Sequence, residues 1–82
     1  MTVRLRLFAR AREAAGTGEA MRAPGGTLAA LLDDARVTYG ADFAAVLERS
    51  RVWVNGDDPV DGLATVLADG DEVAVLPPVS GG

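Results

Sequence analysis

The residues best suited to chemistry are the last six, Pro77-Pro78-Val79-Ser80-Gly81-Gly82. Two glycines at a carboxyl terminus make a slim end without side chains, which can enter a narrow channel. The two prolines before them are stiff and extended, so they form a rigid base for that end. From Val79 to Gly82 the chain can reach roughly 13 Å. The pattern is typical of a carboxylate that is itself the reactive group, although a frayed terminus is the plainer alternative.

Side chains elsewhere supply little catalytic chemistry. The chain contains no His, Cys or Lys, and all eight basic residues are arginines. A Cys or Lys nucleophile, a His general base and a zinc site of Cys and His are therefore excluded. The chain is poorly equipped to act as an enzyme by itself, and we expect neither a bound metal nor a bound cofactor. An activated terminal acyl group would also find no thiol or lysine on its own chain.

Length and composition indicate one globular domain, residues 1–82, from which residues 77–82 project as a tail. Of its 82 residues 49% are hydrophobic and 24% charged, and the net charge of −4 argues against nucleic acid as a partner. No apolar run approaches the ~20 residues that span a bilayer, and no signal-peptide core precedes the domain. We expect a soluble, cytoplasmic protein with no membrane partner.

The first half predicts two strands and two helices. Residues 2–8 alternate, with Arg4 and Arg6 on one face and apolar residues on the other, namely Val3, Leu5 and Leu7. Phe8 falls on the arginine side. Residues 9–18 are expected as a loop or hairpin connection, and 19–23 as a short second strand.

The helices are expected after the break at Pro24-Gly25-Gly26. Thr27 is a candidate N-cap, and Gly40 is the expected stop of the main helix. The apolar face of this helix has helical spacing, with Leu28, Leu31, Leu32 and Ala35. Asp42 is expected to cap a second short helix with an apolar face of Phe43, Val46 and Leu47.

The second half returns to strands. Residues 51–55 are rich in β-forming residues and end at the turn signal Asn55-Gly56, and Trp53 is expected in or beside the core. Residues 60–67 give no firm assignment. A turn over 68–71 precedes a last strand over 72–76, in which parity places Val73 and Val75 inward and Ala74 and Leu76 outward.

This order of elements favours an α+β fold, in which one main helix crosses one face of a mixed sheet. Parallel pairing of the first and last strands as central neighbours is plausible, but the sequence does not show it.

Several motifs together resemble the small subunits of molybdopterin synthase, the MoaD branch of the MoaD/ThiS sulfur-carrier family. The resemblance covers essentially the whole chain, and its most specific part is the acidic turn followed by the Pro-Pro and Gly-Gly ending. The matching segments are Leu7-Phe8-Ala9-Arg10, Thr27-Leu28, Val54-Asn55-Gly56, residues 67–74 and residues 77–82. It implies a β-grasp (ubiquitin-like) fold with a flexible Gly-Gly tail.

The resemblance also implies a reaction cycle. An E1-like adenylating enzyme would use ATP to activate the Gly82 carboxylate, and a sulfur donor protein would convert it into a thiocarboxylate. The tail would then enter the molybdopterin synthase large subunit, within a heterotetramer, and donate sulfur to cyclic pyranopterin monophosphate. Catalytic groups would belong to these partners.

Carried over by residue, Gly82 is the modified residue and Gly81 gives it clearance. Phe8 and Leu76 fall at outward apolar positions that contact the large subunit in this family, and the tail residues Pro77, Pro78 and Val79 would bind partners as well. Ordinary surface scatter is the alternative for Phe8 and Leu76. The acidic residues Asp69, Asp71 and Glu72 either attract a basic partner or simply solvate a turn.

Other functions share the same tail. A sulfur carrier for thiamine thiazole synthesis or another pathway would use the same chemistry, and a ubiquitin-like protein modifier would end in an isopeptide bond. A plain β-grasp interaction module with an inert tail is the third class.

Overall fold

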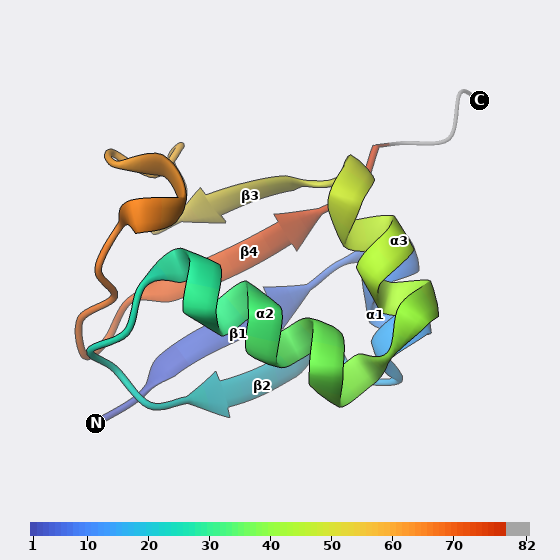
Figure 1. Cartoon of the computed structure of the whole chain (residues 1–82), viewed down its shortest axis with the longest axis horizontal. Helices are drawn as coiled ribbons and strands as arrows, with labels where there is room; N and C mark the ends of the chain where they lie inside the picture. The colour runs from blue at the N-terminus through green and yellow to red at the C-terminus, as the bar shows by residue number, and fades with distance from the viewer. Residues whose placement is uncertain (79–82) are drawn as a thin grey trace.

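A mixed sheet covered on one face by helices makes up the fold (Figure 1). The computed structural model describes residues 1–78. The elements in chain order are β1 (Val3–Leu7), α1 (Ala9–Ala15), β2 (Glu19–Arg22), α2 (Leu28–Tyr39), α3 (Ala41–Arg49), β3 (Arg51–Val54), the short 3-10 turn η1 (Gly62–Ala64) and β4 (Glu72–Leu76). No helix within residues 1–78 has the length and apolar character needed to cross a bilayer. This is the α+β arrangement that the order of elements predicts, and it is the β-grasp fold that the resemblance implies.

The two central strands run parallel. The strand order is β2-β1-β4-β3, so the first and last strands of the fold are neighbours at its centre. Leu5 lies opposite Val73 and Leu7 opposite Val75, while β2 and β3 pair antiparallel at the two edges. The pairing that the sequence left open is therefore present.

The core lies between the sheet and the helices. The predicted inward residues of β1 and β4 and the apolar stripe of α2 are all buried, and α3 adds Phe43 and Leu47. Tyr39 at the end of α2 packs against Phe43, with ring centroids 5.1 Å apart. The buried hydrophobic residues are Val3, Leu5, Leu7, Ala11, Leu28, Leu31, Leu32, Ala35, Phe43, Leu47, Leu67, Val73 and Val75.

The prediction of a loop over residues 9–18 is wrong, because Ala9–Ala15 forms α1. Its sequence, Ala-Arg-Ala-Arg-Glu-Ala-Ala, consists of strong helix formers. Gly16 ends the helix at φ 77, a left-handed conformation that favours glycine. Ala11 provides the buried contact of this short helix. The glycines at 16 and 18 indicate a connection, but they do not exclude a helix before them.

The main helix begins and ends where the sequence predicts. The Thr27 hydroxyl accepts a hydrogen bond from the Ala30 N–H at 3.2 Å, and Gly40 terminates α2. Asp42, in contrast, is not the cap of α3, because Gly40 at φ 94 ends α2 and also precedes α3. Asp42 instead lies in the first turn of α3, where a negative charge favours the helix dipole.

The unassigned stretch before β4 contributes to the core. Its only regular element is the turn η1, and the Thr65 carbonyl accepts the N–H of Leu28 at 2.8 Å. Leu67 is 2% exposed and belongs to the buried cluster. Leu67 was not identified from the sequence because this segment has neither a helical nor a strand period.

A pair of polar side chains joins the β3 turn to the start of β4. The Asp71 carboxylate accepts hydrogen bonds from the Asn55 side-chain amide at 2.9 Å and from the Ala68 N–H at 2.8 Å. The Asn55 side-chain oxygen accepts the Glu72 N–H at 2.9 Å. Asn55 first and Ala68 second lower the pKa of Asp71 below its ordinary value of 3.8. Asp71 therefore has a structural role in this turn.

We expect the Asp71→Asn substitution to lower the free energy of unfolding by about 1 kcal/mol at neutral pH, because an amide has one acceptor oxygen where the carboxylate uses two. The lowered pKa means that the contribution of the carboxylate is full above pH 3.8 and is lost as the pH falls. Urea unfolding between about pH 6 and about pH 3 should show a steeper loss for the wild type than for the variant. Asp58→Asn, at an exposed position, is the control, and equal pH slopes for all three proteins would contradict this role.

Candidate functional site

The parallel central pair brings two distant parts of the sequence to one edge of the sheet. β1 ends at Leu7 and β4 ends at Leu76, so Phe8 and Pro77 leave the sheet side by side. The Phe8 N–H donates to the Val75 carbonyl at 3.3 Å, which fixes this proximity. The base of the tail therefore lies next to the start of α1.

Phe8 and Leu76 lie on the face that the helices leave open, as their parity predicts. Leu76 follows inward Val75 on β4, and the ring of Phe8 lies 5.2 Å from the guanidinium carbon of outward Arg6. Both Phe8 and Leu76 are half-buried. Their place beside the tail base separates them from scattered surface residues, and their contact with a partner stays a prediction.

Trp53 belongs to the same open face, which corrects the expectation that it packs in or beside the core. It lies opposite Ala74, whereas its neighbours Val52 and Val54 pack against the core. Arg51 and Trp53 share the outward parity of β3, and both line a hollow together with Leu76. The alternation in Arg51-Val52-Trp53-Val54 already indicates that Trp53 faces the same side of the sheet as Arg51. The strand was predicted from the β-propensity of all its residues, without regard to the side that each one faces.

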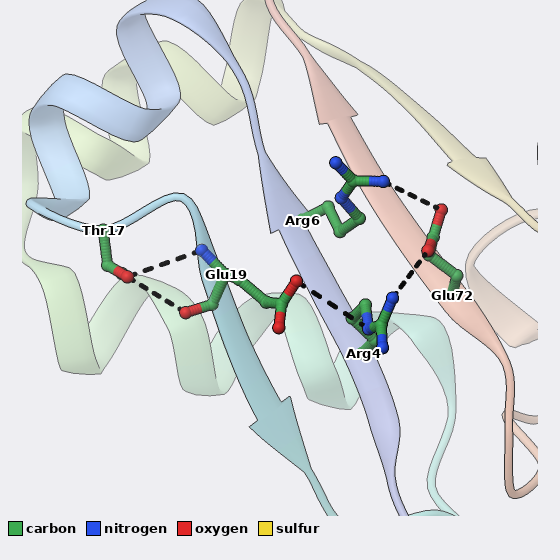
Figure 2. A network of polar contacts seen from close by, with 5 residues as sticks. All are labelled: Arg4, Arg6, Thr17, Glu19 and Glu72. Atoms are coloured by element: carbon green, nitrogen blue, oxygen red, sulfur yellow. Dashed lines mark hydrogen bonds and ion pairs between the residues drawn. The ribbon is translucent and has the colours of Figure 1, made fainter.

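A charged region occupies the other part of the open face. Figure 2 shows Arg4 between Glu19 and Glu72, and Arg6 beside Glu72, across β2, β1 and β4. The N–O distances are 3.8 Å for Arg4–Glu19, 3.8 Å for Arg4–Glu72 and 3.9 Å for Arg6–Glu72. Such long, exposed pairs contribute little stability. They keep this region polar and solvated.

Arg6 lies at the boundary between the two regions. Its guanidinium contacts Glu72 on the charged side and the Phe8 ring on the apolar side. The open face is thereby divided into a polar part towards the start of β1 and an apolar part towards the tail. The apolar part consists of Phe8, Trp53, Ala74 and Leu76.

The tail base is flanked by two hollows. One, of about 370 Å³, lies between Pro77-Pro78 and helices α1 and α3, and the other, of about 550 Å³, lies between the same prolines and β3. Pro77 is half-buried and Pro78 is exposed. The predicted site residues Val79, Gly81 and Gly82 lie outside the described residues.

Arginines line these hollows, and sequence reasoning did not single them out. Arg10 and Arg49 line the first hollow, and Arg49 and Arg51 the second. The arrangement combines apolar side chains, cationic side chains and a stiff proline pair. Because the chain has no Cys, Lys or His, none of these nucleophiles or general bases lies beside the proline pair.

Comparisons with known proteins identify the family and the fold of the chain. The ThiS family model matches residues 5–82. The chain is 33% identical over 78 residues to the sulfur carrier protein CysO of Mycobacterium bovis, which covers 82% of this chain and 84% of that protein. The small archaeal modifier protein SAMP1 of Methanosarcina acetivorans superposes with a TM-score of 0.83 at 33% identity, covering 99% and 96% of the two chains. A chain from the complex of subunits 1 and 2 of the molybdopterin-converting factor of Helicobacter pylori gives a TM-score of 0.71 at 26% identity, with full coverage of both chains.

Trp53 is the single tryptophan and reports on the apolar part of the open face. We expect acrylamide to quench it in the native state, and Leu76→Ala to increase the quenching constant because the leucine side chain covers its neighbour on the same face. Val66→Ala, at an exposed position away from this face, is the control. An unchanged quenching constant in Leu76→Ala would show that the Leu76 side chain does not cover Trp53.

Proposed function

The chain belongs to the ThiS family and is a ubiquitin-like sulfur carrier, and from this premise we propose that the Gly82 carboxylate is the group that carries the sulfur. We further propose that the carrier is the small subunit of a molybdopterin synthase. In this role it supplies the sulfur, whereas the catalytic groups belong to the large subunit.

The observation that carries the proposal is the position of the tail base. Pro77 and Pro78 leave the end of β4 beside Phe8, at the apolar part of the open face. A partner that packs on Phe8, Trp53 and Leu76 would therefore have the tail entrance next to its contact surface. Docking and insertion of the tail become one event, which lowers the entropic cost of placing Gly82 in a deep site.

The proposed chemistry proceeds in two steps on an E1-like adenylating enzyme. A carboxylate oxygen of Gly82 attacks the α-phosphorus of ATP, and pyrophosphate leaves. A hydrosulfide equivalent from a sulfur donor protein then attacks the carbonyl carbon, and the bond to AMP breaks. The product is a thiocarboxylate, whose sulfur is a soft nucleophile.

The acceptor in this proposal is cyclic pyranopterin monophosphate in the large subunit. The likeness to a chain of the Helicobacter pylori two-subunit complex supports it, because the full lengths of both chains superpose. The chain supplies no cofactor of its own in this scheme, and the activating partner consumes the ATP. The pterin pocket would lie in the large subunit, with the carrier tail as its sulfur source.

A second candidate is a carrier that delivers sulfur to another acceptor. The 33% identity over 78 residues to the mycobacterial sulfur carrier CysO supports it. Both candidates use the same Gly82 thiocarboxylate and differ only in the protein that receives the tail. The likeness to SAMP1 raises protein modification as an outcome to be tested.

We expect deletion of Gly82 to abolish sulfur loading, because the new terminal carboxylate falls short of the reacting position by roughly 3.5 Å. The variant and the wild type would be incubated with the activating enzyme, ATP and sulfide, and then weighed by mass spectrometry. The wild type should gain one sulfur in place of one oxygen. Val37→Ala, at an exposed position of α2, is the loading control.

Unfolding must be excluded as the cause of that loss, so the thermal transition of the truncated protein should match that of the wild type. Loading of the truncated protein, or a wild type that never gains sulfur, would contradict the proposal. Attachment of the chain to lysines of foreign proteins would indicate a modifier instead.

Replacing Phe8 or Leu76 by Arg should weaken binding to the molybdopterin synthase large subunit by about 2 kcal/mol or more, as expected for a buried apolar anchor. Val37→Arg introduces the same side chain on the helical side and should leave the affinity unchanged. Calorimetric titration of the large subunit measures all three variants. Equal affinities would reject the open face as the contact surface, while loading of Gly82 would be unaffected by that result.

A further inference from the structure

We propose that Arg10, Arg49 and Arg51 form an arginine collar, which binds acidic side chains of the activating enzyme around the entrance that admits the tail. The inference rests on the proposed function of Gly82 and adds the recognition of one partner to it. It concerns the cationic side chains around the tail base, which adjoin the apolar anchor Leu76 in one of the two hollows.

The three arginines surround the tail base from three elements. Arg10 belongs to α1, Arg49 is the last residue of α3, and Arg51 is the first residue of β3. Arg10 and Arg49 line the hollow on one side of Pro77-Pro78, and Arg49 and Arg51 line the hollow on the other side. Because Arg49 and both prolines belong to the two hollows, the arginines form one continuous surface around the stalk.

The collar has no acidic partners among the described residues. Within residues 1–78, the arginines that form ion pairs are others, namely Arg4, Arg6, Arg22 and Arg36. No Asp or Glu lines either hollow, and all three collar side chains are exposed. Their charges are therefore available to an external anion.

Five of the twelve acidic residues lie in one segment at the other end of the molecule. The segment between β3 and β4 carries Asp57, Asp58, Asp61, Asp69 and Asp71, and Figure 1 shows this segment opposite the end where β4 leads into Pro77. The longest dimension is 35 Å, so this acidic segment is well separated from the collar, although Glu13, Asp42 and Glu48 lie on the helices α1 and α3. Such a charge distribution orients the tail end towards an acidic surface during approach.

The geometry of tail insertion defines what the collar meets. Gly82 lies at most roughly 13 Å beyond Val79, so a partner that reacts with it must bring its entrance close to the stalk base. The surface around that entrance would then face the collar. Guanidinium groups match carboxylates with paired hydrogen bonds, which makes an acidic protein rim the complementary surface.

The activating enzyme is the partner to which we assign this surface. Sulfur carriage to any acceptor, and protein modification as well, begins with activation of the terminal carboxylate. A recognition surface placed around the tail base would thus be used in every turn of the cycle. Acceptors differ between the candidate pathways, whereas this step is shared by them.

A local role at the end of a helix is the competing explanation for one of the three arginines. Arg49 lies in the last turn of α3, where a cation favours the helix dipole. Loss of that role would lower the stability of the carrier, and it would not change the KM for the carrier in a salt-dependent manner. A kinetic experiment at two salt concentrations separates the two explanations.

The test compares two double variants with the same loss of charge. Arg10→Gln/Arg49→Gln removes two collar charges, and Arg22→Gln/Arg36→Gln removes two charges that pair with Asp34 and Asp33 away from the tail. ATP–pyrophosphate exchange by the E1-like adenylating enzyme of the same organism is measured against carrier concentration. We expect the collar variant to raise the KM for the carrier about tenfold at low salt with kcat unchanged, and the control pair to change it less than about twofold.

The salt dependence and the wild type complete the test. Near 1 M salt the difference between the collar variant and the wild type should shrink, because exposed charges are screened over about 3 Å. Equal KM values for the two double variants, an effect independent of salt, or a lower KM for the collar variant would overturn the collar. A wild-type carrier that supports no exchange would instead overturn activation of Gly82, and the two failures are therefore distinct.

Discussion

The parallel pairing of β1 with β4 is the constraint on which the site depends. Parallel strands end at the same edge of a sheet, so the residues after Leu7 and after Leu76 must leave the fold together. The pairing is held by buried Leu5, Val73 and Val75, and each inward side chain fixes the outward position of its neighbours. A register slip of one residue would bury Ala74 and Leu76 and expose the valines. Burial in the core thus sets the surface that we propose for partner contact.

The open face gains its polarity pattern from the same alternation. Outward positions near the start of β1 and β4 carry Arg4 and Glu72, and those near the end carry Phe8 and Leu76. Arg6 contacts both parts, which gives the boundary a defined place. Weak, solvated ion pairs that stay at the rim of an interface cost little binding free energy. Removal of water from the apolar end, in contrast, contributes favourably to the binding free energy. One face can therefore dock a partner and still be compatible with water when it is free.

Strong periodic patterns made the strands and α2 predictable, while the exceptions have separate physical causes. Alternation in β1 and β4 placed every inward residue correctly, and the Thr27 cap and the leucine spacing placed α2. Helix α1 was missed because the two following glycines indicated a loop and outweighed seven good helix formers. Leu67 could not be predicted as buried, because its segment is irregular and its burial depends on how that segment packs against α2. Trp53 was placed on the wrong side because a large aromatic residue suits either a core or a contact surface.

The collar could not be predicted from the sequence, for a different reason. Arg10 and Arg49 are 39 positions apart, and no local pattern relates them until α1 and α3 bring them to the same hollow. The use of arginine at these positions, in a chain without lysine, has a chemical consequence. An activated Gly82 acyl group would be attacked by a nearby lysine amine, whereas a guanidinium stays protonated and is a poor nucleophile. Arginines can therefore supply positive charge around a reactive tail without consuming it, and a carrier with lysines at these three positions would place a competing acceptor beside its own reagent.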